Sequence, residues 1–136
     1  MRSGDVVCRL GGDEFVVLVE QVGDERDLVE LAERIVAAAA RTIVVDGAQV
    51  RIGASVGVAV ARDAGTDADV LFAEADAAAY RAKGHGRGRA EVFDDALRAE
   101  LSARAELEAA IRAGLRNGEM QLHYQPVFDL LSLIHI

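Results

Sequence analysis

Two adjacent carboxylates follow two glycines at Gly11–Glu14, between the apolar runs Val6–Cys8 and Phe15–Val19. Two β-branched runs joined by a short glycine-containing link predict antiparallel strands, with the acids at the tip of the hairpin. Gly11 and Gly12 let the backbone approach a ligand that a Cβ would exclude, and phosphate is the ligand we expect. Such carboxylates suit Mg²⁺ or Mn²⁺, because a hard cation takes one or two of them together with water and substrate phosphate.

The alternative for these four residues is an ordinary solvated hairpin turn. Short motifs have high false-positive rates, so the four residues on their own favour that alternative. The rest of the chain has to decide between the two.

Basic residues alternate with glycine in a second segment, Lys83–Arg89. A flexible backbone and positive charge together suit a phosphate group. Cations are also favoured at the C-terminus of a helix, and glycine commonly ends helices, so a purely structural role is an equal alternative.

The composition describes one Ala/Val/Leu-rich domain of 136 residues, 51% hydrophobic but only 4% aromatic. A net charge of −8 argues against a general DNA or RNA binder. We expect no membrane contact and a cytoplasmic setting, because the sequence shows neither a membrane-length apolar run nor a leader. The single Cys8 is expected to be a small buried hydrophobe.

Periodicity predicts the elements that position these residues. Thr66 is the expected cap of the helix that leads to the basic segment, and Gly53 and Gly57 are expected to mark a bulge or a close approach inside a central strand. The expected elements are a hairpin over 1–22, a helix capped by Asp24 and Asp27, a strand at Ile43–Val45, a strand at Val50–Val60, a helix from Thr66 to about Lys83, a strand at Ala90–Phe93, a helix capped by Asp94 and Asp95 that runs to about Arg116 as a connector or dimer contact, and a strand at Met120–Val127.

Several motifs in order and spacing resemble the GGDEF domain of diguanylate cyclases. Gly11–Phe15 is similar to its signature, Ser55–Ala59 to its central strand, and Ala75–Arg87 to its closing helix and basic loop. Arg112–Asp129 is similar to the lead-in of an EAL-type cyclic diguanylate phosphodiesterase domain, although the Glu-Ala-Leu signature does not follow.

The resemblance implies a reaction in which two GTP molecules, on two facing domains of a homodimer, condense to cyclic diguanylate. Asp13 and Glu14 would be the catalytic and metal-binding carboxylates, and Asp13 is the better candidate for the metal and for any base. Gly11 and Gly12 would admit the phosphates, and Lys83 and Arg87 would hold the β and γ phosphates.

Arg2 and Asp5 resemble the family's inhibitory product site, where a guanidinium and a carboxylate grip a cyclic diguanylate dimer. Arginine suits this bidentate and stacking role better than lysine. Gly88 departs from the family pattern, which usually has asparagine there, and this casts doubt on the order of the basic loop.

The expected fold is α/β, an antiparallel sheet with flanking helices like the palm of nucleotide cyclases and polymerases. Residues 1–93 are expected to be the C-terminal part of a GGDEF domain, 94–117 a connecting helix, 118–130 the start of an EAL-type domain, and 131–136 a tail derived from a sequencing adapter. The family's upstream metal-binding and guanine-recognising residues are absent, so we expect a fragment truncated at both ends and inactive alone.

The expected parent is a cytoplasmic or membrane-tethered cyclase fused to a phosphodiesterase. The alternatives are a non-catalytic GTP or cyclic diguanylate sensor that regulates the phosphodiesterase, and a plain structural α/β domain.

Overall fold

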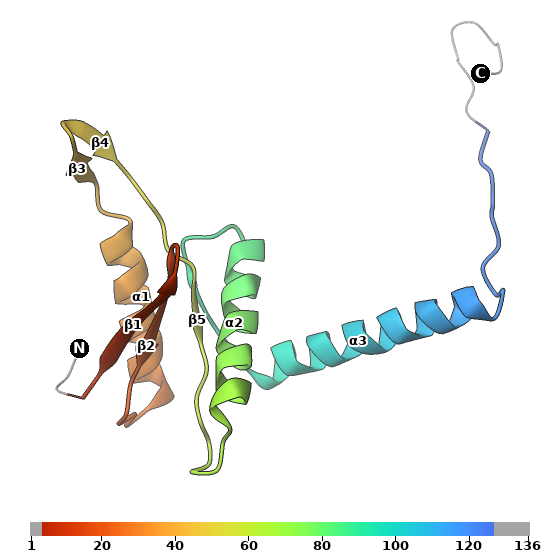
Figure 1. The fold of residues 1–136 in the computed structure, drawn as a ribbon, viewed down its shortest axis with the longest axis horizontal. Coiled ribbons are helices and arrows are strands. Elements are labelled where there is room, and N and C mark those ends of the chain that lie inside the picture. Colours follow the sequence, from red (N-terminus) through yellow and green to blue (C-terminus); the bar gives the residue numbers. More distant parts are fainter. Residues whose placement is uncertain (1–3, 127–136) are drawn as a thin grey trace, which may run out of the picture. The chain divides into compact units, whose positions relative to one another are not determined.

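The computed structural model describes residues 4–126, which form three helices and six short strands (Figure 1). The mixed α/β class predicted from the sequence is confirmed. The elements in chain order are β1 (Val6–Gly11), β2 (Glu14–Leu18), α1 (Glu25–Ala39), β3 (Ile43–Val45), β4 (Ala48–Val50), β5 (Val56–Val58), α2 (Ala68–Gly84), β6 (Ala90–Val92) and α3 (Asp95–Arg116).

The strands form three separate pairs. β1 with β2 and β3 with β4 are antiparallel, and β5 with β6 is parallel. The expected single antiparallel sheet is therefore wrong for β5 and β6. Parallel strands need a long crossover connection, and α2 supplies one between them.

The parallel pair of β5 and β6 is the centre against which the first two helices pack. Both α1 and α2 contact β5 and β6. The buried apolar residues are mostly small, which lets helices and strands approach closely; they are Ala32, Val58, Ala78, Ala82 and Leu97.

The expected close approach at Gly57 is confirmed. A Cβ built on Gly57 would overlap the carbonyl oxygen of Ala75 and the backbone nitrogen of Ala79 in α2. Glycine therefore sets how closely β5 packs against this helix.

Helix boundaries follow local capping. Asp24 caps α1 by accepting a hydrogen bond from the N–H of Arg26 at 2.9 Å, as expected. The cap of α2 is Asp67, which accepts from the N–H of Asp69 at 2.9 Å, and not Thr66. The Thr66 hydroxyl instead donates to the carbonyl of Asp63.

Three further expectations are wrong. The expected strand Val50–Val60 is divided, because Val50 ends β4, which pairs with β3, and only Val56–Val58 forms β5, which pairs with β6. Residues 120–126 form no strand, and Leu122 and Tyr124 are more than four-fifths exposed. Cys8 is exposed because β1 pairs with β2 alone.

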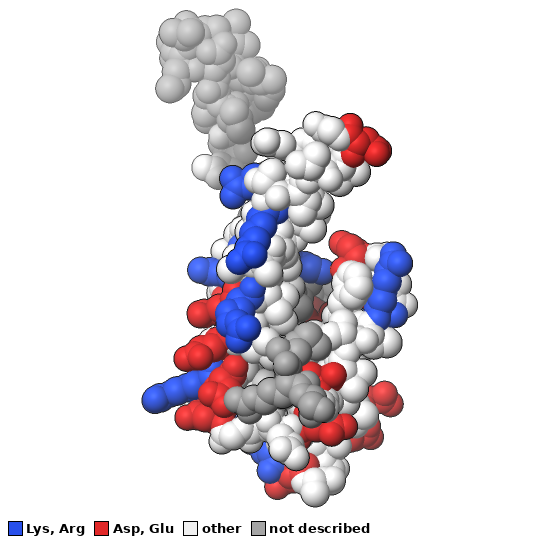
Figure 2. Space-filling view, turned by 90° about the vertical axis from the view of Figure 1, so that its left-hand side faces the viewer, with Lys and Arg blue, Asp and Glu red and all other residues white. Residues whose placement is uncertain are grey.

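The chain divides between Leu97 and Arg98 into two compact units. Acidic and basic side chains are interspersed on the face shown in Figure 2. Among residues 4–126, the helices are too short or too polar to cross a membrane. The expected tail at 131–136 lies outside the described residues.

Candidate nucleotide-binding and catalytic site

The β1–β2 hairpin holds the two carboxylates at its tip, as the sequence predicted. Arg9 pairs with Phe15 and Gly11 pairs with Glu14, and the register shifts between these two pairs. Gly12 adopts a φ of 54°, in the left-handed region that favours glycine. The turn therefore depends on this residue, and it leaves Asp13 exposed at the tip.

The side chain of Arg9 stabilises the turn through hydrogen bonds. Its guanidinium donates two hydrogen bonds to the carbonyl of Gly12, from Nε at 3.1 Å and from Nη2 at 2.7 Å. The same group lies 6.0 Å from the ring centroid of Phe15, within the range of a cation–π contact. Sequence reasoning missed this positioning role, and its signal is a long cation directly before the glycines and an aromatic residue directly after the acids.

Both glycines face open space. A Cβ built on Gly11 or Gly12 would meet no heavy atom within 4 Å. An anionic ligand could therefore approach the backbone of the turn, beside the exposed carboxylates of Asp13 and Glu14.

The turn also supplies some of the ligands that a hard cation needs. Two neighbouring, exposed carboxylates match the one or two that Mg²⁺ usually takes when water and phosphate complete its shell. Within residues 4–126, no cluster of three or more His, Cys, Asp or Glu side chains is arranged to hold a metal ion. Asp13 and Glu14 would thus hold the cation together with oxygens from the substrate.

The basic segment after α2 is an ordered turn. Gly86, Arg87 and Gly88 all have positive φ values, of 101°, 62° and 62°. The N–H of Arg87 donates to the carbonyl of Ala82 at 3.0 Å, which closes the C-terminus of the helix. Asparagine is the residue type that best tolerates this conformation after glycine, so Gly88 suits the backbone that an asparagine would adopt.

Two arginines are engaged in the fold, Arg81 just before the segment and Arg89 at its end. Nε of Arg81 is buried and lies 3.3 Å from the carboxylate of Glu91, and its Nη2 donates to the carbonyl of Val92 at 2.6 Å. Arg89 donates to the carbonyl of His85 and lies 3.8 Å from Glu91. Arg89 therefore fits the structural alternative for the segment, and Arg81 has a structural role beside it.

Lys83 and Arg87 are different, because both are exposed. Within the described residues, no carboxylate lies at ion-pair distance from either side chain. Both are therefore available to an anion from solution. The strained backbone of Arg87, a non-glycine residue at positive φ, is a feature that clusters at functional sites.

Asp94 joins this cluster to the start of α3. Its carboxylate accepts a hydrogen bond from the N–H of Leu97 at 2.8 Å and another from Arg81 at 3.3 Å. The Leu97 N–H, with help from the Arg81 guanidinium, holds the pKa of the Asp94 carboxyl below its ordinary value of 3.8. The expected cap of α3 is thereby confirmed.

Replacing Asp94 with alanine is expected to lower the free energy of unfolding by ~1 kcal/mol, because the first turn of α3 loses its cap. Asparagine should retain most of the stability, since its side chain caps equally well. The carboxylate's own contribution is present above pH 3.8 and is lost as the pH falls through the lower folded-state pKa. Urea unfolding at pH 7 and pH 3 measures both effects, and an alanine variant as stable as the asparagine variant would contradict the cap.

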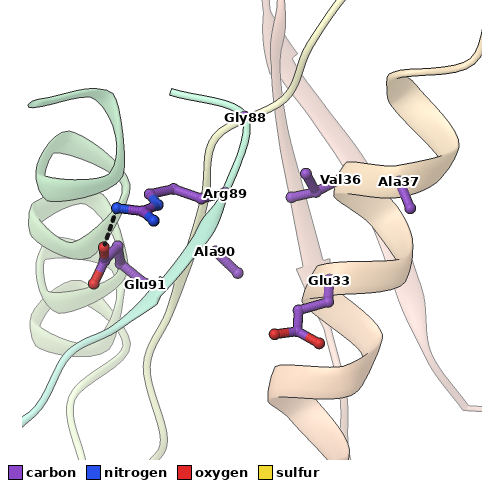
Figure 3. Close-up of a pocket in the computed structure, with 7 residues that line it drawn as sticks. All are labelled: Glu33, Val36, Ala37, Gly88, Arg89, Ala90 and Glu91. Atoms are coloured by element: carbon purple, nitrogen blue, oxygen red, sulfur yellow. Dashed lines mark ion pairs between the residues drawn. The ribbon is translucent and has the colours of Figure 1, made fainter. Parts of the chain in front are cut away.

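A cavity of about 400 Å³ lies beside the basic segment, between α1 and the start of β6 (Figure 3). Its lining residues are Glu33, Val36, Ala37, Gly88, Arg89, Ala90 and Glu91. None of them is a site residue predicted from the sequence. The arginine in this wall is already paired with Glu91, as Figure 3 shows, so the cavity offers a weaker anion site than the exposed cations.

The structure places the predicted residues in two groups. Asp13 and Glu14 share the hairpin tip with the two glycines, and Lys83 and Arg87 share the turn after α2. Among the described elements, no extensive contact joins the hairpin to α2. Asp5 is half-buried just before β1, and Arg2 lies outside the described residues.

The chain is similar to known proteins. The chain matches the family described as "Diguanylate cyclase, GGDEF domain" over residues 1–89. A solved structure of a TpbB (YfiN) mutant from Pseudomonas aeruginosa, comprising only the GGDEF domain, superimposes with a TM-score of 0.68 at 31% identity, over 75% of this chain and 60% of that one.

Two curated relatives come from Pseudomonas aeruginosa. The bifunctional diguanylate cyclase/cyclic di-GMP phosphodiesterase MucR is 36% identical over 93% of this chain and 18% of its own length. The cyclic di-GMP phosphodiesterase NbdA is 32% identical over 96% of this chain and 16% of its own length. The chain thus spans less than a fifth of either relative.

Proposed function

Because the chain belongs to the diguanylate cyclase GGDEF domain family, we propose that it forms part of the domain that makes cyclic diguanylate from two GTP molecules in a longer signalling protein. The observation that carries this proposal is the two-glycine turn, which is open to solvent and has exposed carboxylates at Asp13 and Glu14. An open backbone beside two acids suits a nucleotide triphosphate held with a divalent cation.

Each group has a defined part in this proposal. The turn at Gly11 and Gly12 accepts the phosphates, and Arg9 keeps its backbone rigid through two hydrogen bonds. Asp13 takes the proton of the attacking 3′-hydroxyl, and Glu14 helps to hold the cation. A bound Mg²⁺ or Mn²⁺ would stabilise charge on the phosphoryl oxygens. Lys83 and Arg87 hold the β and γ phosphates.

Two chains are needed, since each 3′-hydroxyl attacks the α-phosphorus of a nucleotide on the facing domain and displaces its β and γ phosphates as pyrophosphate. We further propose fusion to an EAL-type phosphodiesterase domain, which begins at residues 118–130. The named activities of MucR support a cyclase and a phosphodiesterase in one protein.

The test is formation of cyclic diguanylate by the purified parent protein with GTP and Mg²⁺, measured by chromatography. We expect product from the parent and none from the 136-residue chain alone, because the family's upstream metal-binding and guanine-recognising residues are absent from these 136 residues. A parent that binds GTP but makes no product would overturn the cyclase function.

That outcome would support a second candidate, a sensor domain that binds GTP or cyclic diguanylate and regulates the phosphodiesterase. The relative NbdA, named as a phosphodiesterase alone, favours this candidate. GTP that changes the rate of cyclic diguanylate hydrolysis by the parent, without synthesis, would establish it.

Replacing Lys83 or Arg87 with alanine is expected to weaken GTP binding by roughly 10-fold for each residue, because each removes one charge-assisted contact to phosphate. Calorimetry on the parent at two salt concentrations measures the loss and its screening. Arg41→Ala removes another exposed cation elsewhere and should leave the affinity unchanged. Equal effects of all three variants would indicate a general charge effect.

Product inhibition at Arg2 and Asp5 is also part of the proposal. Asp5→Ala in the parent should relieve inhibition by added cyclic diguanylate. Unchanged inhibition would show that Arg2 and Asp5 do not form an inhibitory product site.

A further inference from the structure

The carboxylate of Glu91 contacts both ends of the basic turn that follows α2. Its Oε1 lies 3.1 Å from Nδ1 of His85, before the turn, and 3.8 Å from Nη1 of Arg89, after it. Its Oε2 lies 3.3 Å from the buried Nε of Arg81, in the last turn of α2. One carboxylate therefore holds the chain on both sides of residues 86–88.

Glu91 is itself held in place by the strands. It lies in the middle of β6, where it pairs with Gly57 of β5, and its side chain is only 19% exposed. A second connection crosses the turn, because Nη1 of Arg89 donates to the carbonyl of His85 at 3.3 Å. The contacts of Glu91 thus fix the turn to the parallel strand pair.

The turn needs such support because its backbone is strained. Gly86, Arg87 and Gly88 all have positive φ values, and this conformation is unfavourable for Arg87, which carries a Cβ. The hydrogen bond from the N–H of Arg87 to the carbonyl of Ala82, at 3.0 Å, requires the turn to fold back on the helix. A strained residue persists where the surrounding structure holds it, and Glu91 supplies that structure from outside the turn.

The same carboxylate divides the cations of this region into two groups. It lies at ion-pair distance from Arg81 and Arg89, whereas Lys83 and Arg87 are exposed. Lys83 lies in the last turn of α2 and Arg87 lies in the turn itself, so the fold of the turn sets the distance between them. That distance decides whether both can bind one phosphate chain.

We propose that Glu91 is a positioning residue for anion binding. Through His85 and Arg89 it holds the turn in the conformation in which Lys83 and Arg87 bind the phosphates of one nucleotide together. This proposal rests on the proposed function for the roles of Lys83 and Arg87. Glu91 acts through the turn and does not touch the ligand, since cations of the fold already surround its carboxylate.

The direction of the effect distinguishes positioning from charge. A carboxylate beside a phosphate site repels the ligand, so removing its charge would by itself tighten binding. A positioning role predicts the opposite result. Glu91→Gln in the parent is expected to weaken the binding of inorganic pyrophosphate by roughly 10-fold, the loss that follows when the binding-competent turn falls to about a tenth of the molecules. Calorimetry with pyrophosphate measures this affinity.

Glu33→Gln is the matched control. Figure 3 shows Glu33 on α1, across the cavity from the ion pair of Arg89 with Glu91. Removing its charge changes the local potential in the same direction but leaves the contacts of the turn intact, so the affinity for pyrophosphate should stay within about twofold of the wild-type value. A Glu91→Gln variant that binds pyrophosphate as tightly as the wild type, or more tightly, would overturn the proposal.

Hydrogen exchange tests the order of the turn without a ligand. Deuterium uptake by residues 84–89 of the ligand-free parent, measured by mass spectrometry, should be roughly 10-fold faster in Glu91→Gln than in the wild type or in Glu33→Gln. A contribution to global stability alone would leave the affinity of the folded protein for pyrophosphate unchanged. Equal uptake in all three proteins would show that Glu91 does not order the turn.

His85→Ala is a second variant, which decides the matter if Glu91→Gln fails to fold. The His85 side chain is 56% exposed, so its loss should not prevent folding. It removes one contact to the same carboxylate and should weaken pyrophosphate binding by about threefold. An unchanged affinity in this variant would contradict the positioning role.

These measurements separate the positioning role from the cyclase function, because pyrophosphate binding requires no catalysis. A parent that makes cyclic diguanylate with the same KM for GTP after Glu91→Gln would overturn the positioning role alone. Weaker pyrophosphate binding after Glu91→Gln, in a parent that makes no product, would support the positioning role although the cyclase function had failed.

Discussion

Replacing Asp13 with asparagine in the parent protein is expected to lower the rate of cyclic diguanylate formation by ~100-fold or more, with GTP binding largely retained. The carboxylate lies exposed at the tip of the β1–β2 hairpin, where the turn at Gly12 and the two hydrogen bonds from Arg9 hold the backbone. Asparagine has nearly the same shape but cannot take a proton. The variant therefore keeps the shape of the side chain but removes the charge that accepts the proton and helps to hold the cation.

Single-turnover assays with GTP and Mg²⁺ measure this effect. Glu30→Gln is the matched control, because it removes one exposed carboxylate from α1 and should leave the rate unchanged. The rate of the Arg9→Ala variant should fall between the rates of these two variants, since the turn would lose its two hydrogen bonds but keep its acids. An Asp13→Asn variant as active as the Glu30→Gln control would exclude Asp13 from catalysis.

Replacing Gly57 with alanine is expected to lower the free energy of unfolding by at least ~3 kcal/mol, or to prevent folding of this unit. The new Cβ would overlap the backbone of Ala75 and Ala79, which cannot move without displacing α2 from β5. Backbone atoms of a packed helix do not adjust as a flexible side chain would. The loss should therefore exceed that of an ordinary surface substitution.

Gly53→Ala provides the comparison in the same segment. A Cβ at this position meets no heavy atom within 4 Å, so alanine should change the free energy of unfolding by no more than ~1 kcal/mol. If the backbone conformation there suits alanine, the substitution should raise the free energy of unfolding. Urea unfolding followed by circular dichroism measures both variants. Similar stabilities for the two would show that α2 does not rest on Gly57 in solution.

Local patterns in the sequence were sufficient for the hairpin and for most helix boundaries. The two glycines between β-branched runs indicate the turn that places Asp13 at the tip, because the backbone conformation there depends on neighbouring residues only. Asp24 and Asp94 likewise bond to backbone N–H groups within three residues of themselves. Such interactions join residues that are close in the sequence, so they can be predicted without knowledge of the fold.

The roles of the basic residues depended on tertiary structure. Arg81, Lys83, Arg87 and Arg89 are indistinguishable as cations at the end of a helix. Glu91, in the next strand, lies at ion-pair distance from Arg81 and Arg89. The other two remain exposed.

The pairing of β5 with β6, and therefore the length of each strand, could not be predicted from the sequence either. The sequence by itself therefore determined where the acids lie and where α1 and α3 begin. Only the tertiary structure decided which cations are free to bind phosphate, because ion pairs and strand pairs join residues that the chain brings together only on folding.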